Sequence, residues 1–336
     1  MRYRDKGRLV LAGDIGGTKI NLCIYSQGKT RPIPRVMESY SSRSAPDLET
    51  VIERFVQRHS ASFGGTCLAV AGPVIDGRSK LTNLPWEVSE TRIKRRFGWT
   101  ARIINDLASI GLAIPLLHNR ELHPLNLVRP RKGHNIAIIA PGTGLGTSIL
   151  ASYEGIYVPI ASEGGHVDFA PADENQVLLW RYLRQRYGHV SVERIVSGMG
   201  ILNIFYCLKE ARDYRVPEWL GLEIEEKDPA QAIAEAAMNS QEPLCVEVLR
   251  VFSSILGAVA GNLALTVLAT GGVYLAGGIP PKILPALLEG AFIKAFSDKG
   301  RFKDLLEKIA VRVILNDKAA LLGAARCALE SDLEMV

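Results

Sequence analysis

A short glycine-rich turn between two apolar runs occurs twice in the chain, and this repeat restricts the fold more than any other feature. The first turn, at 12–19, separates the apolar runs 9–11 and 20–25. The second, at 141–147, also lies between two apolar runs. Apolar runs joined by a few glycine-containing residues predict β-hairpins. Because the second hairpin comes about half a chain after the first, the sequence predicts an internally duplicated fold that binds a nucleotide between its halves.

The turns themselves have two interpretations. Glycine permits positive φ angles and lets an anion approach the backbone, so that several N–H groups can point at a phosphate. A carboxylate repels a phosphate, so Asp14 would act there through a metal ion or a water molecule. An ordinary hairpin, whose glycines only close the turn, explains the first pattern equally well. The second turn lacks the glycine spacing of a Rossmann fingerprint, and no Walker A pattern occurs in the sequence.

The order of the remaining elements is typical of a mixed α/β protein, in which ligands bind at the carboxyl ends of strands. Further strands are expected at 34–40, 66–74, 101–104, 273–276 and 311–314. Helices are expected from Ser44 to His59, from Ser89 to Gly98, at 173–187, 199–211 and 243–270, from about residue 282, and at 317–330. The polar stretch 216–228 is expected to be a surface loop.

Composition restricts the class of protein. With 336 residues, of which 47% are hydrophobic and 22% charged, the chain is long and apolar enough for two globular domains. The net charge of +5 is spread along the chain, with basic clusters only at 92–96 and 129–132. Neither cluster is interleaved with aromatic residues, so we expect no nucleic-acid partner.

The cysteines and the apolar segments indicate the cellular compartment of the protein. The five cysteines form no Cys-x-x-Cys pair, which favours buried, reduced thiols and a cytoplasmic protein. The charged residues before Leu9 do not resemble a signal peptide. The uncharged segment 251–281 is long enough to span a membrane, but glycines interrupt it repeatedly. We therefore expect a buried helix followed by a buried strand, and no membrane partner.

Asp106 is the candidate for acid–base chemistry. It follows the expected strand 101–104, at an end where ligands bind, and its carboxylate could accept the proton of an attacking hydroxyl. The alternative is structural, because Asn105 and Asp106 could simply cap the helix that follows.

A second polar group follows the second hairpin. Glu163 and His166 stand three residues apart in a loop with glycines between them, a spacing that suits hydrogen bonds to vicinal sugar hydroxyls; Glu193 can be interpreted in the same way. Glu163, His166 and Asp168 could also hold a divalent ion, but a single imidazole without neighbouring His or Cys makes a poor metal site. Gly277 and Gly278 follow an apolar strand and could admit a flat base, or could form only a turn into a helix.

Together these segments resemble the bacterial glucokinase family, which belongs to the superfamily of actin, sugar kinases and heat-shock-chaperone ATPases. The resemblance extends from about residue 9 to about residue 323. It rests on the order and spacing of 13–18 (GDIGGT), 104–106 (IND), 142–146 (GTGLG), 163–169 (EGGHVDF) and 275–279 (LAGGI). The segment 163–169 is the most specific of these.

The resemblance implies a duplicated actin-like ATPase (ribonuclease H-like) fold, with two α/β domains around a central cleft. It implies a homodimer that transfers the γ-phosphate of ATP to the 6-hydroxyl of glucose, with Mg²⁺ as cofactor, in the first step of glycolysis. The implied phosphate and nucleotide contacts are Gly13, Asp14, Ile15, Gly16, Gly17, Thr18, Gly142, Thr143, Gly144, Gly277 and Gly278, with Asp14 holding the magnesium through water. The implied glucose contacts are Asn105, Asp106, Glu163, His166 and Glu193, with Asp106 as the catalytic base.

The domains are expected to be 1–116 plus 316–336, which is the smaller, and 117–315. Lys19 stands where many relatives carry Asn, a departure of little expected effect. The related repressor branch has a zinc-binding cysteine cluster that 168–188 lacks, so zinc is not expected. A kinase for another hexose, such as mannose, fructose or an N-acetylated amino sugar, remains the main alternative, and a sugar-sensing ATPase without phosphotransfer is a second.

Overall fold

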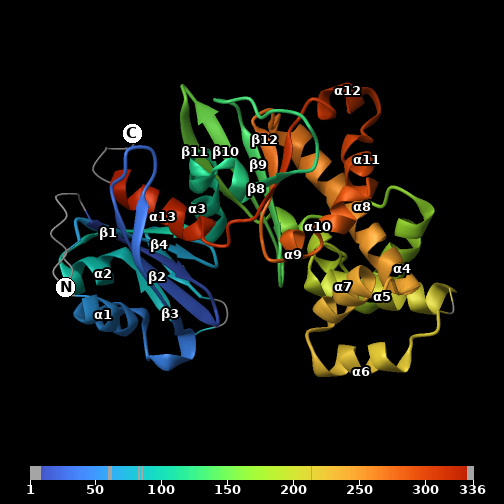
Figure 1. Ribbon diagram of the computed structural model, residues 1–336, viewed down its shortest axis with the longest axis horizontal. Coiled ribbons are helices and arrows are strands. Elements are labelled where there is room, and N and C mark those ends of the chain that lie inside the picture. The colour runs from blue at the N-terminus through green and yellow to red at the C-terminus, as the bar shows by residue number, and fades with distance from the viewer. Residues whose placement is uncertain (1–8, 60–62, 82–83, 85, 213, 331–336) are drawn as a thin grey trace. The chain divides into compact units, whose positions relative to one another are not determined.

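The computed structural model describes residues 9–59, 63–81, 84, 86–212 and 214–330. The chain divides into two compact units (Figure 1). Unit 1 consists of the chain up to residue 119, residues 159–161 and the segment from residue 316 onward. Unit 2 consists of 120–158 and 162–315. Each unit contains a β-sheet and helices of its own, which confirms the predicted mixed α/β class.

Unit 1 is built on a sheet with the strand order β3-β2-β1-β4-β7. These strands are β1 (Leu9–Ile15), β2 (Lys19–Ser26), β3 (Ile33–Ser41), β4 (Gly65–Val70) and β7 (Thr100–Asn105), and β5 (Arg78–Lys80) and β6 (Glu87–Ser89) form a separate pair. The helices are α1 (Leu48–His59), α2 (Glu90–Phe97), α3 (Asp106–Ala113) and α13 (Ala319–Glu330). β1 pairs antiparallel with β2 and parallel with β4, which in turn pairs parallel with β7.

The central strand β1 is buried on both of its faces, which explains why it is a continuous apolar run rather than an alternating one. Leu11 and Ile15 point to one face and pack with Phe55 and other apolar residues of α1. The opposite face is covered by α13, which packs on β1 and β4 and also on α3 (Figure 1). The carboxyl ends of β1, β4 and β7 therefore share one edge of a sheet that is covered on both faces.

Unit 2 has the strand order β11-β10-β9-β12-β13-β8. Its strands are β8 (Leu122–Pro124), β9 (Ile136–Pro141), β10 (Leu145–Tyr153), β11 (Ile156–Ser162), β12 (Gly272–Leu275) and β13 (Val311–Ile314). Its helices are α4 (Glu174–Tyr187), α5 (Gly198–Arg212), α6 (Glu218–Glu226), α7 (Pro229–Asn239), α8 (Pro243–Val267), α9 (Ile279–Lys282), α10 (Leu284–Leu288), α11 (Ala291–Ser297) and α12 (Lys303–Leu306).

Short 3₁₀ helices occur in both units. Unit 1 contains η1 (Ser42–Ser44) and η2 (Ile114–Leu116), and η3 (Asn119–Glu121) lies at the boundary. Unit 2 contains η4 (Gly164–His166), η5 (Val192–Arg194) and η6 (Gly300–Phe302).

The two sheets share one topology, which confirms the predicted duplication. When β8 is left out and the strands of each sheet are counted in chain order, the third, second and first strands lie side by side, and the fourth and fifth follow on the other side of the first. The first and second strands form an antiparallel hairpin in both units, and the fourth strand is parallel to the first in both. β8 is an additional edge strand, antiparallel to β13.

The apolar segment 251–281 forms a core helix and a buried strand, as predicted. α8 meets the length and composition of a membrane-spanning helix, but 67% of its most apolar window is buried inside the protein. Two of its glycines allow α11 to pack closely. A Cβ atom on Gly257 would lie 2.2 Å from the carbonyl oxygen of Phe292, and one on Gly261 would lie 2.4 Å from that of Phe296. All five cysteines lie in the described part of the chain, where each is buried, as predicted, and none forms a disulfide.

Several local predictions were wrong. The stretch 216–228, expected as a loop, contains α6, because Leu220 and Ile224, one helical turn apart, pack against the core of unit 2. The residue that caps α1 is Asp47 and not Ser44. The Asp47 Oδ1 atom accepts a hydrogen bond from the Thr50 backbone N–H at 2.8 Å. The single helix expected from about residue 282 is divided into α9, α10, α11 and α12.

The two glycine turns are shorter than predicted. β1 extends to Ile15, so Gly13 and Asp14 belong to the strand and only 16–18 forms the turn. Similarly, only 142–144 separates β9 from β10. No glycine of 16–18 or 142–144 has a positive φ angle, so that part of the expected reason for glycine at these turns was wrong, whereas the close approach of an anion stays a prediction. Both turns close β-hairpins, which confirms the hairpin interpretation without excluding an anion at either turn.

Candidate active site

Asp14 lies near the carboxyl end of β1, where neighbouring strands provide its surroundings. Asn21 on β2 is its direct cross-strand partner and donates a hydrogen bond from Nδ2 to Asp14 Oδ2 at 3.2 Å. Ser39 on β3 stands opposite Asn21 and donates from Oγ to Asn21 Oδ1 at 2.7 Å. Burial raises the pKa of Asp14, whereas the Asn21 hydrogen bond and the charges of Lys318 and Lys19 lower it.

Asp106 follows β7 and is the first residue of α3. The Oδ1 atom of Asn105 accepts hydrogen bonds from the backbone N–H groups of Leu107 at 3.0 Å and Ala108 at 3.3 Å, so Asn105 is the helix cap. The pKa of Asp106 is raised to about 6, chiefly by burial and also by the nearby negative charge of Asp14, against the lowering effect of its hydrogen bonds. At neutral pH this carboxylate is ionised and basic enough to accept a hydroxyl proton.

Strand register explains why the two carboxylates lie close together. Asp14 on β1 stands opposite Ala69 on β4, and Ala69 stands opposite Ile104 on β7, two residues before Asp106. Since β1, β4 and β7 are parallel, their carboxyl ends present both side chains at one edge. Unit 1 therefore carries a pair of acidic groups at the edge where ligands bind to α/β sheets.

The first turn lies beside this pair and is held by its own hairpin and by the end of β3. The backbone N–H of Gly16 donates to the carbonyl of Lys19 at 2.9 Å. Ser42 donates from its backbone N–H to the carbonyl of Thr18 at 3.0 Å and from Oγ to the carbonyl of Gly16 at 3.2 Å. Gly17 and Thr18 stand at the tip, and the Thr18 side chain is exposed to solvent. Gly13 and Ile15 are buried in β1.

The second turn belongs to unit 2 and is held by Glu193. The backbone N–H of Gly142 donates to the carbonyl of Gly144 at 2.8 Å, and the carbonyl of Gly142 accepts a hydrogen bond from Gly198 at 2.9 Å. Glu193, on η5, accepts a hydrogen bond at Oε2 from the backbone N–H of Leu145 at 2.8 Å. The predicted donor turn and a predicted sugar contact are thus in direct contact.

Glu163 precedes η4 and His166 is its last residue, and η4 packs on β10. A Cβ atom on Gly165 would lie 2.1 Å from the carbonyl oxygen of Leu145, so this loop approaches β10 as closely as only glycine permits. The Glu163 and His166 side chains are exposed to solvent, which leaves them accessible to a ligand. Within unit 2, the structure therefore brings η4, η5 and the second turn together.

The segment after His166 joins η4 to η5. Val192 donates from its backbone N–H to the carbonyl of Val167 at 2.9 Å, and Phe169 donates to that of Val190 at 3.0 Å. Asp168, which the sequence suggested as an alternative metal ligand, lies within hydrogen-bond distance of His189, with Nε2 and Oδ1 2.7 Å apart.

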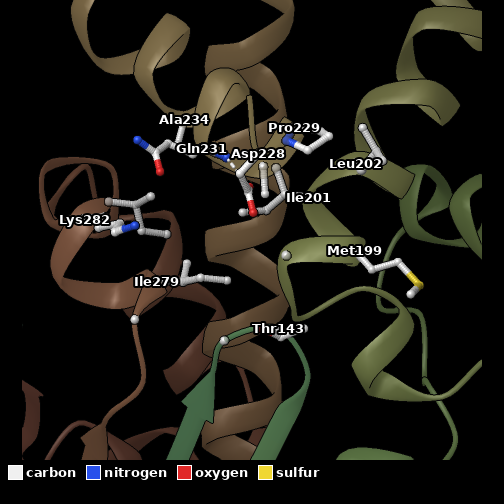
Figure 2. A pocket seen from close by; sticks show the side chains of 15 residues that line it. Thr143, Met199, Ile201, Leu202, Asp228, Pro229, Gln231, Ala234, Ile279 and Lys282 are labelled. Carbon is white, nitrogen blue, oxygen red and sulfur yellow. Dashed lines mark hydrogen bonds between the residues drawn. The ribbon is translucent and has the colours of Figure 1, made fainter. Parts of the chain in front are cut away.

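A pocket of about 400 Å³ lies beside the second turn in unit 2 (Figure 2). Gly142 and Thr143 form one side, and Gly278, Ile279 and Lys282 form another. The rest of the wall comes from the first residues of α5 and from α7 with its cap: Gly198, Met199, Ile201, Leu202, Asp228, Pro229, Ala230, Gln231 and Ala234, with Ile283 beyond α9. Its mostly apolar walls and few polar groups are typical of a site for a flat organic group.

Gly277 follows β12 and lies against the end of β9. Its φ angle is +80°, and a Cβ atom there would lie 2.5 Å from the carbonyl oxygen of Pro141. Gly278 has no atom near its Cβ position and lines the pocket directly. The chain after β12 therefore runs against the end of β9, where the second turn begins.

Sequence reasoning missed the contributions of α7 and of Asn21. Asp228 caps α7 by accepting a hydrogen bond at Oδ1 from the Gln231 backbone N–H at 2.9 Å, and both residues line the pocket. The pair Asp228-Pro229 is a strong helix-start signal that could have revealed α7. The role of Asn21 depends on strand register, which the sequence does not state.

Magnesium fits the acidic pair of unit 1. Within the described residues, no group of three or more His, Cys, Asp or Glu side chains could hold a metal ion. Magnesium carried by phosphates needs only one or two carboxylates, because phosphate oxygens and water complete its coordination. Asp14 has a second carboxylate oxygen in addition to the one that Asn21 contacts, and the negative charge of Asp106 nearby favours a cation.

The fold is found in solved sugar kinases. A crystal structure of glucokinase from an Antarctic psychrotroph matches with a TM-score of 0.86 and 28% identity, covering 96% of this chain and 99% of that one. The structure of a Balamuthia mandrillaris glucokinase in complex with glucose matches with a TM-score of 0.79 over 96% of this chain and 94% of that one, and at 21% identity it shows the fold alone. The duplicated sheets and these matches define an ATP-dependent sugar kinase with the actin-like ATPase fold and two domains.

The sequence comparisons give the family. The sequence profile of the family described as Glucokinase matches residues 11–331. A glucokinase from Nostoc punctiforme is 40% identical over 336 residues, which cover 95% of this chain and 98% of the relative. The chain belongs to the glucokinase family, and the predicted family, fold class and enzyme class are confirmed.

Proposed function

We propose that the chain transfers the γ-phosphate of ATP to the 6-hydroxyl of glucose and that Asp106 accepts the hydroxyl proton. The observation that carries this proposal is the placement of Asp106. It stands at the carboxyl end of a parallel strand, beside Asp14, with a pKa raised to about 6 by burial. A base with a pKa one unit below neutral pH is ionised and still has a useful affinity for a proton.

Unit 2 provides the side chains that we propose as glucose contacts. A neutral sugar offers no charge, so it must be recognised by several polar groups that match its hydroxyls. Glu163 and His166 are exposed and adjacent to η5, which carries Glu193. Two carboxylates that accept and an imidazole that can donate or accept suit vicinal hydroxyls. Asn105 of unit 1 adds a carboxamide next to the proposed base.

The donor is proposed to bind along the two turns and the pocket. The N–H groups of Gly16 and Gly142 close the two hairpins, so the other backbone N–H groups of these turns would contact the phosphates, as in other backbone anion sites. The pocket lined by Gly278, Ile279 and Ile201 would hold the adenosine, and its volume of about 400 Å³ is within the range of small-molecule sites. The transfer itself needs alignment and charge stabilisation more than covalent chemistry by the protein.

Magnesium is proposed to be held at Asp14. The ion neutralises charge that develops on the transferred phosphoryl group. Asn21 and Ser39 orient the Asp14 carboxylate, while Asp106 remains available as the base. The two carboxylates would thus have separate roles: Asp14 would hold the metal and Asp106 would accept the proton.

A coupled assay of hexoses with ATP and magnesium tests the substrate. We expect glucose 6-phosphate formation from glucose, with kcat/KM at least about tenfold above that for mannose, fructose and N-acetylglucosamine, since polar sites discriminate strongly against misplaced hydroxyls. A higher kcat/KM for another hexose would contradict the proposed acceptor. ATP hydrolysis independent of added sugar would contradict phosphotransfer as the function.

The oligomeric state, the cellular location and the pathway of the enzyme are proposed from the family alone. We infer that the enzyme is a cytoplasmic homodimer that supplies glucose 6-phosphate to glycolysis, and that units 1 and 2 are its small and large domains. The buried, reduced state of the cysteines is consistent with the cytoplasm. Sedimentation equilibrium at micromolar concentration would measure the oligomeric state directly.

A further inference from the structure

The Glu193 carboxylate occupies the space beside the second turn. Its Oε2 atom accepts the hydrogen bond from the Leu145 backbone N–H at 2.8 Å. A Cβ atom on Gly144 would lie 2.5 Å from that same oxygen and 3.3 Å from the Glu193 Cδ atom. The carboxylate can therefore take this position only because residue 144 has no side chain.

The backbone around Glu193 is attached to the same turn. Ser197 donates from Oγ to the carbonyl of Glu193 at 2.7 Å and accepts a hydrogen bond from the Gly200 N–H at 3.1 Å, which joins η5 to the beginning of α5. The next residue, Gly198, donates to the carbonyl of Gly142 at 2.9 Å. One backbone bond and one side-chain bond therefore connect the segment 193–198 to the turn 142–145.

We propose that Glu193 is a positioning residue for the donor turn as well as an acceptor contact, and that Gly144 is the residue that permits this double role. This inference rests on the proposed function. A carboxylate has two oxygens and can accept the Leu145 N–H and a sugar hydroxyl at the same time. The bound sugar restricts the orientation of the carboxylate, and the carboxylate holds the turn in the shape that presents its N–H groups.

Binding of the two substrates is therefore coupled through one side chain. Thermodynamic linkage requires the coupling to act in both directions and by the same factor. An alteration in the donor turn then weakens sugar binding when no nucleotide is present. An alteration of Glu193 weakens nucleotide binding when no sugar is present. The second effect is not expected if the turn and the carboxylate serve separate ligands. The first effect also follows if a side chain at residue 144 displaces the Glu193 carboxylate, so the second effect is the discriminating one.

The first test compares an alanine variant in the turn with a control outside both turns and the pocket. Gly144→Ala pushes away the end of a flexible side chain, so the fold tolerates it, whereas Gly221→Ala on α6 enters open space. Titration calorimetry without nucleotide measures the dissociation constant for glucose. We expect Gly144→Ala to bind glucose about fivefold or more weakly than the wild type and Gly221→Ala to bind it within about twofold. Equal glucose affinity in Gly144→Ala and the wild type overturns the proposal.

The reciprocal test uses a non-hydrolysable ATP analogue, AMPPNP, without sugar. Glu193→Ala removes the acceptor of the Leu145 N–H, whereas Glu193→Gln keeps an oxygen that can accept it. We expect about fivefold weaker AMPPNP binding by Glu193→Ala and rescue to within about twofold by Glu193→Gln. Wild-type AMPPNP affinity in Glu193→Ala, with its melting temperature unchanged, overturns the proposal even if Gly144→Ala fails to fold.

The outcomes separate this inference from the proposed function. A wild-type protein that binds and phosphorylates glucose while both tests show no effect retains the proposed function and overturns only the coupling. A wild-type protein that neither binds nor phosphorylates glucose overturns the proposed function, and the coupling with it.

Discussion

Asn21 donates a hydrogen bond from Nδ2 to Asp14 Oδ2 at 3.2 Å, from the position directly across the β1–β2 hairpin. Its own Oδ1 is held by Ser39 Oγ at 2.7 Å, which determines the orientation of the carboxamide. A short chain of polar side chains across three neighbouring strands thus orients the carboxylate that we propose to hold magnesium. Asn21 itself is only 8% exposed, so this network lies within the sheet.

Replacing Asn21 tests whether this orientation matters for catalysis. We expect Asn21→Ala to raise the KM for magnesium–ATP about tenfold, because misplaced ligands in metal sites cost 10- to 100-fold in affinity or activity. The KM for glucose should change little. Ser39→Ala is the matched control, since it acts one step further from Asp14 and should have a smaller effect. Equal kinetics in Asn21→Ala and the wild type would show that Asp14 needs no support from β2.

The pH dependence of the reaction follows from Asp106. Its pKa is raised to about 6, and only the ionised form accepts a proton. We expect kcat/KM for glucose to be constant above pH 7 and to fall about tenfold per pH unit well below pH 6. Initial rates in buffers of constant ionic strength measure this profile. A profile that stays level down to pH 4.5 would mean that another group is the base.

The same carboxylate should destabilise the folded protein at neutral pH. Its pKa is raised from the ordinary 3.8 to about 6, so the unfolded chain releases this proton more readily. The protonated Asp106 side chain therefore stabilises the folded protein fully below pH 3.8. This stabilisation is lost as the pH rises through 6. Asp106→Asn should be more stable than the wild type at pH 8, by up to about 3 kcal/mol, and the difference should shrink toward pH 4.

Urea unfolding of the two proteins at pH 8 and pH 5 measures this difference. A wild-type protein that is more stable than Asp106→Asn at pH 8 would contradict the burial of a costly charge at this position.

Gly277 and Gly278 provide a matched pair for the backbone beside the pocket. Gly277→Ala forces a side chain into a φ angle of +80° and against the Pro141 carbonyl, whereas Gly278 has ordinary backbone and open space. We expect Gly277→Ala to lower the free energy of unfolding by roughly 2 kcal/mol or more, and Gly278→Ala by less than about 0.5 kcal/mol. Chemical denaturation gives both values, and similar losses in the two variants would refute the assignment of strain to Gly277.

The sequence predicted the duplicated α/β fold because the signals that carry it are local. Apolar runs around 12–19 and 141–147 indicate hairpins without reference to the rest of the chain, and their spacing indicates the repeat. The end of α2 at Gly98 was also predictable, since this glycine has the left-handed backbone of a helix cap. The C-terminal end of the long helix α8 was predicted at about residue 270 and lies at Val267 in the structure.

The site was harder to predict, because its contacts join segments that are distant in sequence. Residue types alone suggested Glu193 as a sugar contact, but its hydrogen bond to Leu145 depends on how η5 packs against the second turn. The reason for glycine at 144 was also misjudged, since a neighbouring carboxylate, and not a positive φ angle, requires it. Likewise α6 was missed because its polar composition concealed a narrow apolar side.

The central claim is that Asp106 is the base of the phosphotransfer, and Asp106→Ala tests it most directly. Glucose 6-phosphate formation by this variant is measured with ATP and magnesium, while calorimetry measures its AMPPNP affinity. We predict a loss of about 10³-fold in kcat, typical of a removed general base, with AMPPNP affinity within about twofold of the wild type. A variant that forms glucose 6-phosphate at a rate near that of the wild type would contradict the assignment of Asp106.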